Sequence, residues 1–154
     1  QTLNNPKIVH ILKRLSATYF KSKMESISIE GPLTVEHIMP QGWIKNWPLA
    51  DGSIGMTGSE LWETAVDDPR AEATRKRNTA VQTLGNLTIL TQPLNSAASN
   101  DDWEKKKPEL LLHSLLPINQ NLHNVTVWDE SAIEKRGKEL FERALYLWPR
   151  HSVS

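Results

Sequence analysis

Apolar residues recur at helical spacing near both ends of the chain. The first series predicts an amphipathic helix over residues 5–22, and its members are Ile8, Ile11, Leu12, Leu15 and Tyr19. The second predicts a helix over residues 131–148, and its members are Ile133, Gly137, Leu140, Phe141, Ala144, Leu145 and Trp148. A capping-box pattern at Ser131-Ala132-Ile133-Glu134 predicts where this last helix begins, and Pro149 should end it.

Two short segments between these helices have strand character. Residues 33–38 are apolar and partly β-branched, and residues 84–91 (LGNLTILT) place a Gly turn before a run of β-branched residues and leucines. We expect the two strands to pair. Further helices are predicted over residues 59–66, behind a capping box that Thr57 opens, over residues 70–82, and from about Asp101 onward. Two strands among many helices indicate an α+β fold that is rich in helix.

Length and composition are those of one domain. A chain of 154 residues with 38% hydrophobic residues can build one core, and the zero cysteine count removes disulfides and thiolate zinc sites. No apolar run approaches 18 residues, so we expect no membrane span. The absence of cysteine suits a cytoplasmic location, which we expect. The first residues, QTLNNPK, lack both an initiator Met and a signal-peptide pattern. We therefore expect residues 1–154 to be a single domain from the C-terminal part of a larger chain.

Charge is balanced overall and uneven locally. The formal net charge is zero, which argues against a protein that coats nucleic acid. Residues 1–24 nevertheless carry five bases and no acid, and residues 51–69 carry five acids and no base. A basic cluster follows directly: Arg70, Arg75, Lys76 and Arg77. Such clusters allow weak phosphate binding, although each could also be a solvated helix face.

The candidate chemistry lies at the ends of the two strands. Glu36 and His37 stand side by side in an otherwise apolar run, where a titratable pair is unexpected. A lone His near apolar residues is more often structural, but Glu36 beside it is an oxygen ligand suited to Mg²⁺. Asn86 and Asn95 flank the second strand, and Asn is disfavoured within strands, so each needs a turn or a specific partner. Asn95 could also be an ordinary helix cap.

The segments VEHIMPQ and LGNLTILTQPLNSAAS, in this order, resemble the ββα-metal (His-Me finger) nuclease motif of the HNH superfamily. The second half, through WEKKK, more narrowly resembles the C-terminal nuclease domain of GmrSD-type modification-dependent restriction endonucleases, and ERALYLWP near the C-terminus fits that group too. The resemblance implies a ββα-metal core with a short antiparallel β-hairpin over about residues 33–107, between the helices at 5–22 and 131–148.

The resemblance also implies residue roles. His37 corresponds to the general base, Glu36 to the acidic metal ligand, Asn86 to the central Asn that orients the histidine, and Asn95 to the last metal-binding position. Asn replaces the His that ends the motif elsewhere, which suits Mg²⁺, with Mn²⁺ as a possible substitute. The spacing between His37 and Asn86 is long, and the acidic insert at residues 51–69 has no counterpart role.

The implied activity is a metal-dependent DNA endonuclease that nicks one strand per site. Its context would be a bacterial anti-phage restriction system, and its partner a nucleotide-hydrolysing sensor domain on the same or another chain. Lys106 matches a lysine common in the group and is a candidate phosphate contact, as are Arg75, Lys76 and Arg77, although a solvated lysine is an equal interpretation of Lys106. Two alternatives remain open: an inactive helical interaction module, and an RNA nuclease of the same fold.

Overall fold

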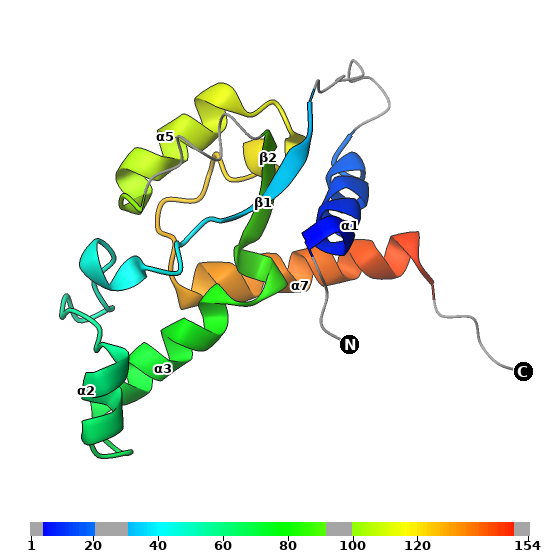
Figure 1. Cartoon of the computed structure of the whole chain (residues 1–154). Helices are drawn as coiled ribbons and strands as arrows, with labels where there is room; N and C mark the ends of the chain where they lie inside the picture. The colour runs from blue at the N-terminus through cyan, green and yellow to red at the C-terminus, as the bar shows by residue number, and fades with distance from the viewer. Residues whose placement is uncertain (1–4, 21–30, 92–99, 150–154) are drawn as a thin grey trace, which may run out of the picture.

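The computed structural model describes residues 5–20, 31–91 and 100–149 (Figure 1). Its helices are α1 (Asn5–Ala17), α2 (Gly58–Glu63), α3 (Pro69–Val81), α5 (Trp103–His113), α6 (Pro117–Gln120) and α7 (Glu130–Leu147). Its strands are β1 (Leu33–His37) and β2 (Leu87–Thr91), and two 3-10 turns are η1 (Trp43–Lys45) and η2 (Leu84–Asn86). The described part is therefore helix-rich around a small two-stranded sheet, which confirms the predicted α+β class. No helix in it is long and apolar enough to cross a membrane.

The two strands pair antiparallel, as predicted. Leu33 lies opposite Thr91, and His37 lies opposite Leu87. The end of β1 that carries His37 therefore meets the start of β2, immediately after η2. Asn86 is the last residue of η2, so Glu36 and His37 at the end of β1 lie next to Asn86 at the same end of the sheet.

Each face of the sheet contributes to a different apolar cluster. One face packs with α1, α6 and α7 in a cluster that includes Leu12, Leu15, Leu87, Ile89, Ile118 and Leu140, with Leu33 and Val35 packed against it. The other face contributes Leu90 to a cluster with Ile38, Met39, Trp43, Trp103, Leu110 and Trp128. Figure 1 shows α1 and α5 on opposite sides of the strands. Successive residues of a strand point to opposite faces, so the alternation in β1 and β2 determines which helix each side chain meets.

Indole groups anchor the long connection between β1 and α3. The Nε1 atom of Trp43 donates to Asn78 Oδ1 at 2.9 Å, and that of Trp47 donates to the Asp101 carbonyl at 3.0 Å. Both rings are buried. Trp103 and Trp128 are buried as well. Trp148, which the sequence places on the apolar series of the last helix, is 44% exposed, and Trp62 is 91% exposed.

Some predicted helix boundaries need correction. The capping box at Thr57 is present, although α2 ends at Glu63 rather than at residue 66, and α1 ends at Ala17. The last helix begins at Glu130, one residue earlier than predicted, because the Asp129 side chain accepts a hydrogen bond from the Ala132 amide at 2.9 Å. Asp129 is therefore the N-cap, and the capping box predicted at Ser131 is wrong.

The buried stripe of α7 is also narrower than predicted. Ile133, Arg136 and Leu140 are its buried residues, spaced three and four apart. Phe141 is 59% exposed, and Leu145 is 42% exposed. The buried line of α7 crosses η2 closely, and Phe141 and Leu145 on its flanks are exposed.

The close crossing of α7 over η2 gives a test of the fold. A Cβ atom added to Gly85 would lie 2.2 Å from the Ile133 carbonyl oxygen, so Gly85→Ala must push α7 away. We expect it to lower the free energy of unfolding by about 1–3 kcal/mol, as overpacking of a core does. Urea denaturation followed by tryptophan fluorescence measures this. Gly58→Ala is the control, because an added Cβ there meets nothing within 4 Å; equal stability of the two variants would contradict the close crossing.

Candidate active site

The Asn86 side chain joins three parts of the chain. Its Oδ1 accepts hydrogen bonds from the Met39 amide at 2.8 Å and from Trp128 Nε1 at 3.0 Å. Its Nδ2 donates to the carbonyls of Met39 at 2.8 Å and Val81 at 3.0 Å. The residue is fully buried. We call this arrangement the Asn86 clamp: a buried amide whose donors and acceptor are all used inside the protein.

The backbone of Asn86 adds to the clamp. Its carbonyl accepts a hydrogen bond from the Ile38 amide at 2.9 Å. Side chain and backbone of one residue therefore hold both residues that follow His37, and this fixes the direction in which β1 ends. Asn suits the position because a single side chain can match both the N–H and the C=O of Met39, as a neighbouring strand residue would.

Arg136 of α7 holds η2 from the other side. It is 5% exposed, and its Nη1 donates to the carbonyls of Gly85 at 2.7 Å and Leu87 at 2.8 Å, the two residues that flank Asn86. Burial lowers the pKa of this guanidinium to about 10, so it remains charged at neutral pH. The sequence analysis missed Arg136 and Trp128. A signal for Arg136 was present, because position 136 lies between Ile133 and Leu140 on the apolar stripe of the last helix.

The imidazole of His37 lies at the end of β1 and is half-buried. Burial is the main cause that lowers its pKa below the ordinary 6.5, and the ammonium of Lys106 acts in the same direction. The carboxylate of Glu36 and a hydrogen bond with Gln82 oppose this shift in the pKa. The result is an imidazole that is neutral at pH 7, the form that can accept a proton from water.

Glu36 and Lys106 form an ion pair on the other side of β1. The Nζ atom of Lys106 lies 2.6 Å from Glu36 Oε1 and donates a second hydrogen bond to the His37 carbonyl at 2.8 Å. Lys106 is 3% exposed, so the ammonium is not a surface charge. It ties α5 to the end of β1 and balances the charge of Glu36. In the structure the Lys106 side chain pairs with Glu36. A phosphate contact by Lys106 stays a prediction.

The predicted metal site is described only in part. Glu36 supplies the hard oxygen donor that Mg²⁺ prefers, and Lys106 engages one of its two oxygens. Asn95, the other predicted ligand, lies outside the described residues. Within residues 5–20, 31–91 and 100–149, no group of three His, Asp or Glu side chains could hold a metal ion. A carboxylate at Glu36 is a donor that suits Mg²⁺, and a metal site formed with Asn95 stays a prediction.

The basic cluster on α3 is mostly engaged within the protein. Arg77 is 3% exposed, forms an ion pair with Glu130 at 2.6 Å, and donates to the carbonyls of Trp47 and Pro48. Arg75 donates to the carbonyl of Leu61 in α2 and to that of Val66 in the α2–α3 connection. Lys76 is exposed. Two of the three predicted DNA contacts on this helix are thus occupied in holding the fold, and DNA contact by the cluster stays a prediction.

Comparison with known families gives one match. Residues 1–143 match the family described as GmrSD restriction endonucleases, C-terminal domain. The chain belongs to this family. Comparisons with curated proteins and with solved structures found no significant match. The GmrSD C-terminal domain is therefore a nuclease domain of the restriction-endonuclease type, and the match covers the Asn86 clamp, Glu36 and His37.

Removing the clamp should destabilise this GmrSD C-terminal domain strongly. Asn86→Ala leaves the Met39 amide and carbonyl and the Trp128 indole without partners in a buried site, and each unsatisfied group costs about 1–3 kcal/mol. We expect the free energy of unfolding to fall by about 3 kcal/mol in urea denaturation. Asn78→Ala is the matched control, because Asn78 is exposed and bonds a single indole. A loss no greater than that of the control would show that the clamp is dispensable.

The pKa of His37 can be measured directly. In the metal-free domain, an NMR titration should give a pKa below that of a peptide with the sequence of residues 33–41, and His37→Asn identifies the signal. The unfolded chain then binds more protons than the folded one between the two pKa values, so stability should rise with pH through that window. A pKa at or above that of the peptide would contradict the burial of this imidazole.

Proposed function

We propose that the domain hydrolyses phosphodiester bonds in DNA, with His37 as general base and Mg²⁺ held by Glu36 and Asn95. The observation that carries this proposal is the half-buried His37 with a lowered pKa, fixed at the end of β1 by the Asn86 clamp next to a carboxylate. Membership of a nuclease family supports it independently.

The step assigned to His37 is removal of a proton from water. The water oxygen forms a bond to phosphorus while the bond to the 3′-oxygen breaks, the proton passes to the imidazole, and the leaving oxygen is protonated to a 3′-hydroxyl. The other product carries a 5′-phosphate. A base already neutral at pH 7 is suited to this step, because it needs no prior deprotonation.

The other residues hold this arrangement. The chemistry that bound Mg²⁺ supplies is neutralisation of the charge that grows on the phosphate group. Lys106 keeps the carboxylate of Glu36 in place and bonds the His37 carbonyl, so the strand end is held from α5 as well as from η2. Asn86 is a positioning residue, because all the hydrogen bonds of its side chain go to the protein itself.

The biological setting belongs to the same proposal. A restriction system would use this domain to nick phage or modified DNA, under control of a nucleotide-hydrolysing domain on the same or a partner chain. One centre of this kind cuts one strand, so a double-strand break requires two domains or two events.

The test is nicking of supercoiled plasmid with Mg²⁺ or Mn²⁺. His37→Ala should lower the rate by at least about 100-fold, the lower range for loss of a general base, and should leave the circular dichroism spectrum unchanged. EDTA should abolish nicking by the wild type. His123→Ala is the control, because His123 is exposed on another part of the surface. Cleavage that survives His37→Ala would assign the base elsewhere, and preferred cleavage of an RNA of equal length would favour the RNA nuclease.

A further inference from the structure

The solvent face of α1 is basic along its whole length. Leu12, Leu15 and Ser16 are the buried residues of this helix. The exposed side chains of Lys7, His10 and Arg14 gather on the opposite side, exposed Lys13 lies beside them at the rim of a pocket, and the helix contains no acid. Residues 7, 10 and 14 follow one stripe at spacings of three and four, and residue 13 lies three after residue 10, so the four side chains form one patch. We call this patch the α1 basic face.

Two cations of this face lack partners inside the protein. Lys13 and Arg14 form no hydrogen bond or ion pair among the described residues, whereas Arg77 pairs with Glu130, Lys106 with Glu36 and Arg143 with Glu139. The helix dipole stabilises Arg14 in the last turn, but it gives no reason for Lys7 in the first. Lys13 and Arg14 therefore present positive charge to the solvent.

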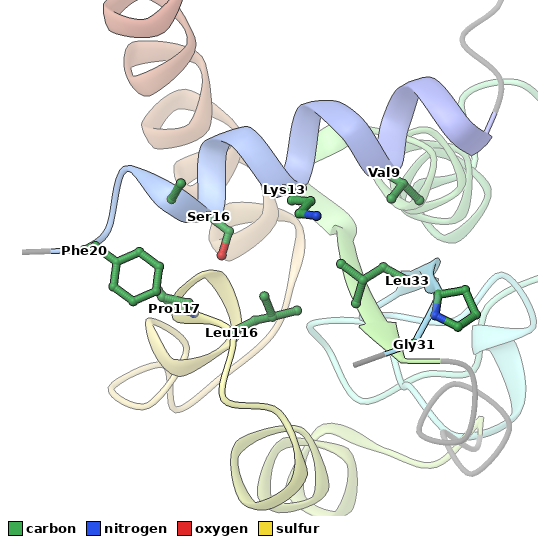
Figure 2. Close-up of a pocket in the computed structure, with 10 residues that line it drawn as sticks. Val9, Lys13, Ser16, Phe20, Gly31, Leu33, Leu116 and Pro117 are labelled. Atoms are coloured by element: carbon green, nitrogen blue, oxygen red, sulfur yellow. The ribbon is translucent and has the colours of Figure 1, made fainter. Parts of the chain in front are cut away.

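The α1 basic face lies on the side of the sheet to which His37 points. Leu33 and Val35 of β1 pack into the cluster that contains α1, and the ladder from Leu33 to His37 is unbroken. Because side chains alternate along a strand, His37 shares the face of Leu33 and Val35, while Glu36 and its partner Lys106 lie on the other. Figure 2 shows Val9, Lys13 and Ser16 of α1 above a cavity that Leu33 also lines.

This cavity helps to place α1 along the strand. Its lining includes Leu33, at the start of β1, together with residues from the C-terminal half of α1. The candidate residues Glu36, His37 and Asn86 do not line it. His37, at the other end of β1, lies beyond this cavity along the same strand.

We propose that the α1 basic face binds the phosphate backbone of the duplex DNA whose strand is cut at His37. The proposal rests on the proposed function, because it assumes that DNA reaches His37. Seven helical steps from Lys7 to Arg14 span about 10 Å, which matches about three phosphates at a rise of about 3.4 Å per nucleotide. Contacts of this type carry no sequence information, so they position the duplex while other parts of the system select it.

The experiment is DNA binding without cleavage. The His37→Ala protein and a short fluorescent duplex are mixed at several salt concentrations, and anisotropy gives Kd at each. Adding Lys13→Gln and Arg14→Gln should raise Kd by about 10-fold at low salt and reduce the slope of log K against log salt by about 2, since each phosphate contributes about 0.9. The exchange Lys13→Arg with Arg14→Lys keeps both charges and should keep Kd and the slope.

The matched control removes two charges from another helix. Lys135→Gln with Lys138→Gln on α7 changes the net charge equally and should leave Kd within about twofold, because these exposed lysines lie among acids. The proposal is overturned if the α1 variant binds DNA as tightly as its parent, or if the parent itself does not bind DNA. It is also overturned if the α7 variant loses as much affinity as the α1 variant.

Nicking assays with His37 restored separate the two proposals. A domain that binds DNA through α1 and never cuts it contradicts the proposed function and leaves the α1 basic face intact. A domain that nicks at the wild-type rate after Lys13→Gln and Arg14→Gln contradicts the role of α1 alone.

Discussion

The side chain of Asn86 uses its donors and its acceptor entirely inside the protein, and this joins segments that lie far apart in the sequence. Through Met39 it holds the chain that leaves β1, through Val81 the end of α3, and through Trp128 the approach to α7. Removing this buried amide would leave its partners desolvated and without hydrogen bonds, which would lower the free energy of unfolding. In the folded protein each of these groups is paired. The direction of β1 at its last residue, and with it the position of His37, follows from this constraint.

Buried cations are held by groups inside the protein, whereas Lys13 and Arg14 of α1 are exposed and have no hydrogen-bond or ion-pair partner among the described residues. Arg77 with Glu130 and Lys106 with Glu36 fix the connections around the sheet, and Arg136 donates to the carbonyls of Gly85 and Leu87 while its guanidinium lies over the Trp128 ring. A buried ion pair seldom adds much stability, but it specifies a geometry, because either charge left unpaired would be costly. The ammonium of Lys106 has a second consequence, since it places a positive charge beside His37 and helps to keep the imidazole neutral.

Local sequence patterns predicted the helices and strands well. They predicted less well which distant side chains contact one another. The pairing of β1 with β2 followed from two short β-branched runs, and the helices followed from apolar spacing, because both signals depend on neighbouring residues. The start of α7 was missed because Asp129 and Ser131 are both good caps, and only the packing of the helix decides between them. The burial of Arg77 and Lys106 depends on carboxylates 53 and 70 residues away, which no local pattern reveals. A motif singled out His37 and Asn86, whereas the contacts that Trp128 and Arg136 make around the clamp required the fold.

The central claim is that Asn86 acts on the chemistry by holding the strand end that carries His37. It is tested most directly by the plasmid-nicking rate of Asn86→Ala at a temperature and pH where circular dichroism shows the variant to be folded, against a stability-matched variant such as Leu140→Ala in the α1–α7 cluster. The account predicts that the Asn86 variant loses nicking while the Leu140 variant keeps it. Wild-type nicking by the folded Asn86 variant would contradict it, because the clamp would then contribute stability alone.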